Sequence, residues 1–158
     1  MLTLKELIEG TKRLRGELNS LPVRIYKMRL HKTVFSATSK LISKDSGHTY
    51  FPSIEWYVDI ANKRKAGFAR GKTKSGKMVY LKLPRISKNK CRVRCNCPDF
   101  VYTYALTLAA KGSLKGDLIS LPKKPKGIGK PRNSKHIPGM CKHLSGLAIR
   151  LRKDGKLK

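Results

Sequence analysis

The chain has 158 residues and a mass of 17.8 kDa, which suffices for one domain of ordinary size and excludes two large ones. It carries 37 lysines and arginines against 9 aspartates and glutamates, and the formal net charge of +28 favours polyanionic partners. The hydrophobic fraction of 39% predicts a folded core, and we find no run of 18 apolar residues and no secretory signal, so we expect an intracellular (cytoplasmic) or virion-internal protein without a membrane partner.

Residues 1–20 predict an N-terminal helix. Thr3 and Glu6 have the spacing of a capping box, in which each side chain accepts a hydrogen bond from the other residue's backbone N–H. Leu2 and Leu7 have the spacing of a hydrophobic staple, and residues 19–22, which end in proline, should end the helix. The apolar stripe of this helix favours packing on the chain's own core over binding to a partner.

Residues 21–90 predict a basic, β-rich region. Apolar and basic side chains alternate over residues 26–31, which is the period of a half-buried strand with one apolar and one basic face. The polar segment 43–47 predicts a reversal of the chain, and alternation over residues 54–60 predicts a second strand. Residues 66–83 contain two short strand-like runs around a glycine-bounded, cationic connection, which predicts a hairpin.

Residues 91–158 predict a strand followed by two helices. The expected elements are a strand over residues 91–97, a helix over 100–111, an extended basic loop over 122–138, and a last helix that starts at Pro138 or Gly139 and fades near residue 153. The helices are expected to present one apolar face each to a shared core.

Cys95, Cys97, Cys141 and His143 form the candidate metal site. They occur as two pairs, each with a spacing of two residues, at the end of the predicted strand and at the start of the last helix. Three sulfurs and one imidazole match the closed, tetrahedral coordination of structural Zn²⁺, which leaves no open position for water or substrate. The alternative is that short-spaced cysteines and a histidine coincide by chance in a buried core.

The remaining cysteine and a loop histidine fit this site less well. Cys91 lies four strand residues before Cys95, about 13 Å along an extended chain, which indicates a buried small side chain. His136 is a reserve ligand, although its place in the basic loop favours a phosphate contact or an exposed side chain. With no secretory signal, metal ligation accounts for the cysteines better than disulfides do.

In these residues the chain resembles the SWIM zinc finger, whose pattern is Cys-x-Cys, an insert, and Cys-x-His. The matching segments are Cys95-Asn96-Cys97 and Cys141-Lys142-His143, and the resemblance covers residues from about 91 to 151. It implies a strand-turn-helix module that binds DNA or protein. The insert, residues 98–140, is longer than usual for the family and is similar to that of phage-encoded members.

The predicted fold class is therefore α+β, with a small antiparallel β-sheet, an N-terminal helix and a strand-turn-helix zinc module. Three regions follow one another along the chain: the N-terminal helix at 1–20, the basic β-rich region at 21–90, and the zinc module at 91–158. We expect Zn²⁺ to be the only cofactor.

Basic side chains are the candidate nucleic-acid contacts, because lysine and arginine pair with phosphates. The candidates are Lys63, Arg64, Lys65, Arg70, Lys72, Lys74, Arg92, Arg94, Lys123, Lys124, Lys126, Lys130 and Arg132. Tyr102 and Tyr104 are candidates for stacking on bases, although Tyr104 fits the core of the predicted helix better.

The acidic residues are few and form no obvious pair of carboxylates, so the sequence predicts neither an enzyme nor a small-molecule substrate. It predicts a non-enzymatic, zinc-stabilised nucleic-acid-binding protein of low sequence specificity, with DNA favoured over RNA. One alternative is a structural component of a phage virion or another large assembly, with the zinc module at an interface with assembly proteins. Another is an accessory protein that delivers a nuclease or recombination enzyme to DNA.

Overall fold

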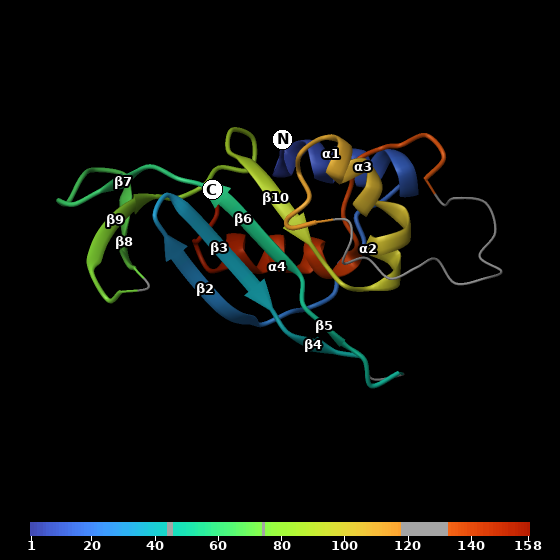
Figure 1. The fold of residues 1–158 in the computed structure, drawn as a ribbon, viewed down its shortest axis with the longest axis horizontal. Coiled ribbons are helices and arrows are strands. Elements are labelled where there is room, and N and C mark those ends of the chain that lie inside the picture. Colours follow the sequence, from blue (N-terminus) through green and yellow to red (C-terminus); the bar gives the residue numbers. More distant parts are fainter. Residues whose placement is uncertain (44–45, 74, 118–132) are drawn as a thin grey trace.

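The computed structural model describes residues 1–43, 46–73, 75–117 and 133–158, and its fold is α+β (Figure 1). The helices are α1 (Leu4–Arg15), α2 (Pro98–Thr103), α3 (Ala105–Ala110) and α4 (Lys142–Lys153). The strands are β1 (Leu2–Thr3), β2 (Ile25–His31), β3 (Val34–Ser39), β4 (Leu41–Ile42), β5 (Thr49–Tyr50), β6 (Ser53–Tyr57), β7 (Ile60–Ala61), β8 (Phe68–Lys72), β9 (Met78–Lys82) and β10 (Lys90–Arg94). Within these described ranges, no helix has both the length and the apolar character needed to cross a bilayer.

Helix α1 begins as the sequence predicts. Thr3 is the N-cap, its hydroxyl accepts the Glu6 N–H at 3.3 Å, and the Glu6 carboxylate accepts the Thr3 N–H at 2.6 Å. The helix ends at Arg15, earlier than predicted, because Gly16 takes a left-handed φ of 81° that few other residues tolerate. Leu2 and Thr3 form strand β1, which pairs with β10.

An antiparallel sheet of five strands forms the centre of the molecule, in the order β1-β10-β6-β3-β2. Strand β2 confirms the predicted strand over residues 26–31, but only Leu30 on its apolar side is buried, because β2 lies at the edge of the sheet. Sequence analysis missed β3. The predicted strand over residues 54–60 is divided, because the chain leaves this sheet after Tyr57 and continues as β7 in another sheet.

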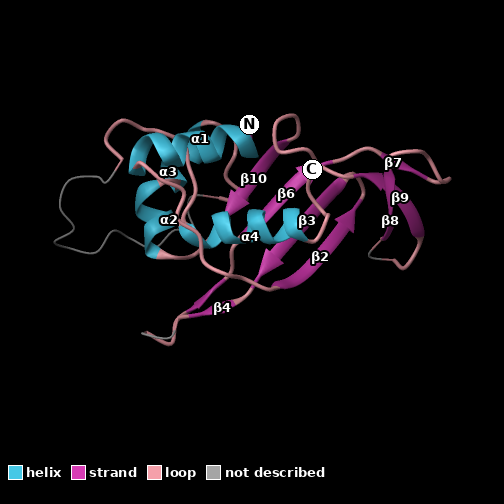
Figure 2. Cartoon of the chain, turned by 180° about the vertical axis from the view of Figure 1, so that it is seen from behind, coloured by secondary structure: helices cyan, strands magenta, loops and turns pink. Residues whose placement is uncertain are grey.

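One face of the five-stranded sheet carries most of the core. Phe35, Ile54, Trp56 and Val93 are buried on neighbouring strands, and the residues between them along each strand are more exposed, except Ser53. Helix α4 lies across this face and contacts β2 and β6, as the view from behind shows (Figure 2). The sheet therefore has a covered face and an opposite face, which is the usual arrangement for antiparallel sheets.

Two smaller sheets are built from hairpins. Strands β4 and β5 pair around the predicted reversal at residues 43–47, where the Gly47 N–H donates to the Ser43 carbonyl at 2.9 Å. Strands β8 and β9 form the hairpin that residues 66–83 predict, and β7 pairs with β9 on its other side. In Figure 1 the three-stranded sheet lies at one end of the molecule and α1–α3 lie at the other.

The helix predicted over residues 100–111 is broken at Tyr104. The side-chain amide of Asn133 donates to the Thr103 carbonyl at 3.0 Å, and the backbone at Tyr104 has a φ of −118°. Tyr104 is fully buried, as expected for a core residue, and its hydroxyl accepts a hydrogen bond from Arg15 Nε at 2.8 Å. This bond connects α1 to the junction between α2 and α3.

Candidate metal centre

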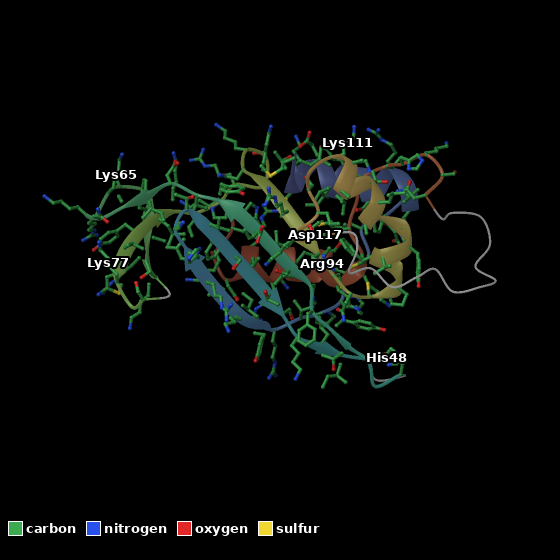
Figure 3. The ribbon with its side chains drawn as sticks, in the orientation of Figure 1. His48, Lys65, Lys77, Arg94, Lys111 and Asp117 are labelled. Atoms are coloured by element: carbon green, nitrogen blue, oxygen red, sulfur yellow. The ribbon has the colours of Figure 1, made fainter. Side chains whose placement is uncertain are left out.

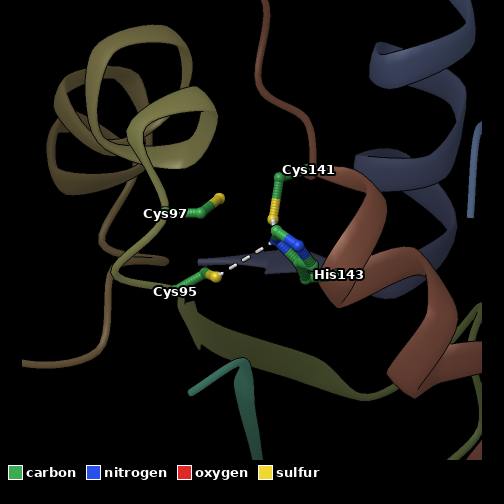
Figure 4. Close-up of side chains that lie close together, drawn as sticks. All are labelled: Cys95, Cys97, Cys141 and His143. Carbon is green, nitrogen blue, oxygen red and sulfur yellow. Dashed lines mark hydrogen bonds between the residues drawn. The ribbon is translucent and has the colours of Figure 1, made fainter. Parts of the chain in front are cut away.

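Side chains from two distant segments meet at one point. The sulfurs of Cys95, Cys97 and Cys141 and a ring nitrogen of His143 all lie within 4.8 Å of one another, and all four residues are buried (Figure 4). His143 Nδ1 is 3.8 Å from Cys95 Sγ and 4.0 Å from Cys141 Sγ. Tetrahedral Zn–S bonds of about 2.3 Å would place two sulfurs about 3.8 Å apart. The cluster thus has the size and the donor atoms of a site that can hold a metal ion.

The first pair of ligands lies where the chain leaves β10 and enters α2. Cys97 is the N-cap of α2 with an extended backbone (φ −73°, ψ 149°), and its sulfur accepts the Phe100 N–H at 3.4 Å. Pro98 suits the first helical position because it lacks an N–H group that would need a partner there. The sulfur of Cys97 is therefore held by the first turn of the helix that follows it.

The second pair lies at the start of α4, which begins at Lys142 rather than at Pro138 or Gly139. The residues just before Lys142 are not helical, and the Met140 N–H donates to the Thr11 hydroxyl of α1 at 2.8 Å. A Cβ atom on Gly10 of α1 would lie 1.8 Å from the Pro138 carbonyl oxygen, so the helix packs directly against this segment. Helix α1 thereby fixes the approach of the chain to Cys141.

Two residues near the ligands were missed by sequence analysis. Asn96 lies between the first two ligands; its Oδ1 accepts the Phe51 N–H at 2.7 Å and its Nδ2 donates to the Thr49 carbonyl at 3.0 Å. The Tyr50 ring lies 4.9 Å from the His143 ring, centroid to centroid. The β4–β5 hairpin therefore covers one side of the cluster. The sequence did offer one indication for Asn96, which is a polar residue placed between two candidate ligands along the chain.

The thiols of the cluster differ in acidity. The pKa of Cys97 is lowered well below its ordinary value, because Cys141 and then Cys95 donate hydrogen bonds to its sulfur. The pKa of Cys141 is raised, first by burial and then by its neighbours Cys95 and Cys97. A bound dication would displace the protons of its cysteine ligands.

Cys91 and His136 lie outside this cluster. Cys91 is fully buried on β10, where it pairs with Trp56 of β6, and this confirms its prediction as a buried small side chain. Burial raises the pKa of Cys91 to about 12. His136 is exposed in the segment before α4. The four side chains that the structure brings together, and that could hold a metal ion, are the four candidate ligands of the sequence analysis.

The described basic candidates fall on two parts of the molecule. Lys63, Arg64, Lys65, Arg70 and Lys72 are exposed on or beside the three-stranded sheet, and Arg92 and Arg94 are half-buried on β10. Figure 3 shows Lys65 and Lys77 at the far end of the molecule and Arg94 near the five-stranded sheet. The candidates Lys74, Lys123, Lys124, Lys126, Lys130 and Arg132 lie outside the described residues.

The two candidate aromatic contacts differ in exposure. Tyr104 is buried in the helical core. Tyr102 is half-buried on α2, and its stacking on bases stays a prediction. Sequence analysis missed Tyr57 at the end of β6. This tyrosine is 44% exposed and lies under the Arg92 guanidinium.

No protein-family model, curated protein or solved structure matches the chain.

Proposed function

We propose that this chain is a non-enzymatic, zinc-stabilised protein that binds nucleic acid, DNA in the first instance, with little sequence preference. The observation that carries the proposal is the charge: 37 basic against 9 acidic residues in one small chain. A charge of +28 on a compact protein is strongly self-repelling, and a polyanion relieves that repulsion and releases its own counterions on binding.

The donor set supports zinc as the metal and a structural role for it. Thiolates and a neutral imidazole are ligands that Zn²⁺ prefers, whereas Mg²⁺ and Ca²⁺ prefer oxygen. Four protein ligands fill a tetrahedral shell, so no position is left for a reacting water. The spacing of Cys95, Cys97, Cys141 and His143, which resembles a SWIM zinc finger, supports the same assignment.

The distribution of exposed cations supports contact with phosphates rather than with one specific ligand. Exposed basic residues occur on the three-stranded sheet and its loops, on β2 and along the helices. Such a spread suits sequence-independent binding, because phosphate contacts position a protein on nucleic acid and carry no base information.

A salt titration tests the proposed function. We expect dye-labelled DNA to bind at low salt, with log Kobs falling against log salt with a slope steeper than about −4, which corresponds to five or more phosphate contacts on a duplex. The control is the same titration at constant ionic strength with a neutral osmolyte in place of salt. Affinity that stays constant when the salt concentration rises about fourfold, from roughly 50 to 200 mM, would contradict the proposal.

Metal analysis tests the second part of the proposal, that zinc stabilises the protein. Freshly purified protein should contain one zinc per chain, and the Cys141→Ser variant should contain none. The Cys91→Ala variant is the matched control, because Cys91 is buried nearby on β10 and lies outside the cluster. Wild-type protein without zinc, or a Cys91→Ala variant that has lost it, would contradict the assignment.

A further inference from the structure

In the described part of the chain, the face of the five-stranded sheet opposite α4 is exposed along β2 and half-exposed along β3, whereas Lys115 covers Ser53 and Glu55 of β6. Figure 1 shows this face toward the viewer with α4 behind the strands, and Figure 2 shows α4 in front of them from the other side. We call it the open sheet face. It consists of Lys27, Arg29 and His31 of β2, Val34, Ser36 and Thr38 of β3, Ser53, Glu55 and Tyr57 of β6, and Lys90, Arg92 and Arg94 of β10.

The strand register places cations at the two sides of this face and small side chains between them. One row runs Arg29, Ser36, Glu55, Arg92, and the next runs Lys27, Thr38, Ser53, Arg94. Strands β2 and β10 are three strand spacings apart, which corresponds to about 14 Å. The open sheet face thus has a floor of Val34, Ser36 and Thr38 on β3 with Ser53 and Glu55 on β6, between basic residues on β2 and on β10.

The single carboxylate on these four strands is neutralised. Lys115 Nζ lies 3.3 Å from the Glu55 carboxylate and donates to the Ser53 hydroxyl at 2.9 Å, and the Glu55 side chain is only 16% exposed. Arg94 donates to the Lys115 carbonyl at 2.9 Å and so holds this loop against the sheet. The face therefore presents net positive charge to any ligand, and its complement is a polyanion.

Tyr57 adds a feature that phosphate binding alone does not need. Its ring is 44% exposed at one end of the floor, and the Arg92 guanidinium lies 5.8 Å from the ring centroid. An aromatic ring beside an arginine can stack on a base while the arginine pairs with the adjoining phosphate. In a duplex the bases are already stacked on one another, so a ring exposed on the face of a sheet can stack only on unpaired bases.

We propose that the open sheet face binds single-stranded nucleic acid, with Tyr57 stacked on a base and with Lys27, Arg29 and Arg92 paired with phosphates. This inference rests on the proposed function and specifies its surface and its ligand. The nucleic acid would lie along the floor of Val34, Ser36 and Thr38, because these side chains are small and leave room for it.

The test measures binding of the full-length, zinc-loaded chain to a dye-labelled mixed-sequence 20-nucleotide DNA and to its duplex, by fluorescence anisotropy. We expect the single strand to bind more tightly than the duplex at equal salt. Tyr57→Ala should weaken single-strand binding by about 5- to 150-fold, the range for loss of one base stack, and Tyr57→Phe, which keeps the ring, should rescue it.

Charge variants separate this surface from the rest of the molecule. The variant Lys27→Gln/Arg29→Gln/Arg92→Gln should lose at least about tenfold more affinity than Lys12→Gln/Arg152→Gln/Lys153→Gln, which removes the same charge from exposed positions on α1 and α4. Circular dichroism and zinc content verify that each variant is folded.

Three results would overturn three different claims. If wild-type protein binds neither DNA at low salt, the proposed function fails. If it binds, but the two triple variants lose the same affinity and Tyr57→Ala loses none, the proposed function stands and the open sheet face is not the binding surface. Tighter binding to the duplex, with no effect of Tyr57→Ala, also overturns the inference about single strands.

Discussion

Removal of the metal is the perturbation whose effect follows most directly from the structure. A bound ion would cross-link Cys95 and His143, which are 48 positions apart in the chain. Treated as a cross-link that restricts only the unfolded chain, closure of a loop of this length contributes about 4 kcal/mol to the free energy of unfolding. For a protein of this size, that corresponds to a fall in Tm of about 8 to 16 °C when the metal is removed.

The assay is thermal unfolding with and without a strong chelator, followed by far-UV circular dichroism and by the fluorescence of Trp56. Trp56 is fully buried on the covered face of the sheet, so its emission shifts when the core opens. In Cys141→Ser the chelator should have no further effect, whereas Cys91→Ala should keep the full response. If protein shown to be metal-free melts within about 2 °C of the untreated protein, the cross-link does not stabilise the fold as reasoned.

Three further predictions concern single residues. Helix propensity alone predicts that Gly10→Ala stabilises the protein by about 1 kcal/mol, but the Cβ would clash with the Pro138 carbonyl, so we expect destabilisation of about 1–3 kcal/mol in urea unfolding. A rise in stability would show that α1 does not pack there. Because burial raises the pKa of Cys91 to about 12, its thiol should stay unmodified by iodoacetamide at about pH 8, as measured by mass spectrometry; rapid alkylation would contradict the burial. Burial likewise raises the pKa of Tyr104, against the opposing effect of Arg15. Since an unfolded tyrosine ionises near pH 10, its contribution to stability is present below about pH 10 and is lost as the pH rises through the folded value. Absorbance at about 295 nm should show one late-ionising tyrosine that is missing in Tyr104→Phe.

Local patterns in the sequence predicted the features that depend on neighbouring residues. The capping box of Thr3 and Glu6 defines the start of α1, and the paired spacing of the cysteines and the histidine predicted which side chains meet. The two capping residues lie three positions apart, and each pair of cluster residues has a spacing of two, although the two pairs come from distant parts of the chain. The hairpin of β8 and β9 follows the same rule, because its two strands adjoin their glycine-bounded turn.

Features that depend on distant partners were not predictable in this way. Helix 100–111 breaks at Tyr104 because the Asn133 side chain, thirty positions from Thr103, takes over a carbonyl there. Strand β3 was missed because Ala37 and Ser39 are too small to mark its buried side, although both are fully buried. The open sheet face combines residues of four strands, and only the register brings them into rows.

The strand order also has a consequence for synthesis of the chain. Strands β2, β3 and β6 are neighbours in the sheet and are made in this order, with only the β4–β5 hairpin between β3 and β6, so they can pair as they emerge. Strand β10 is made later, and until it pairs, β6 presents an unpaired backbone edge to other chains. Strand β1 is made first but stays unpaired until β10 has been made, because Leu2 pairs with Cys91. Arrival of the strand that leads into the first ligand pair therefore also closes an edge prone to aggregation.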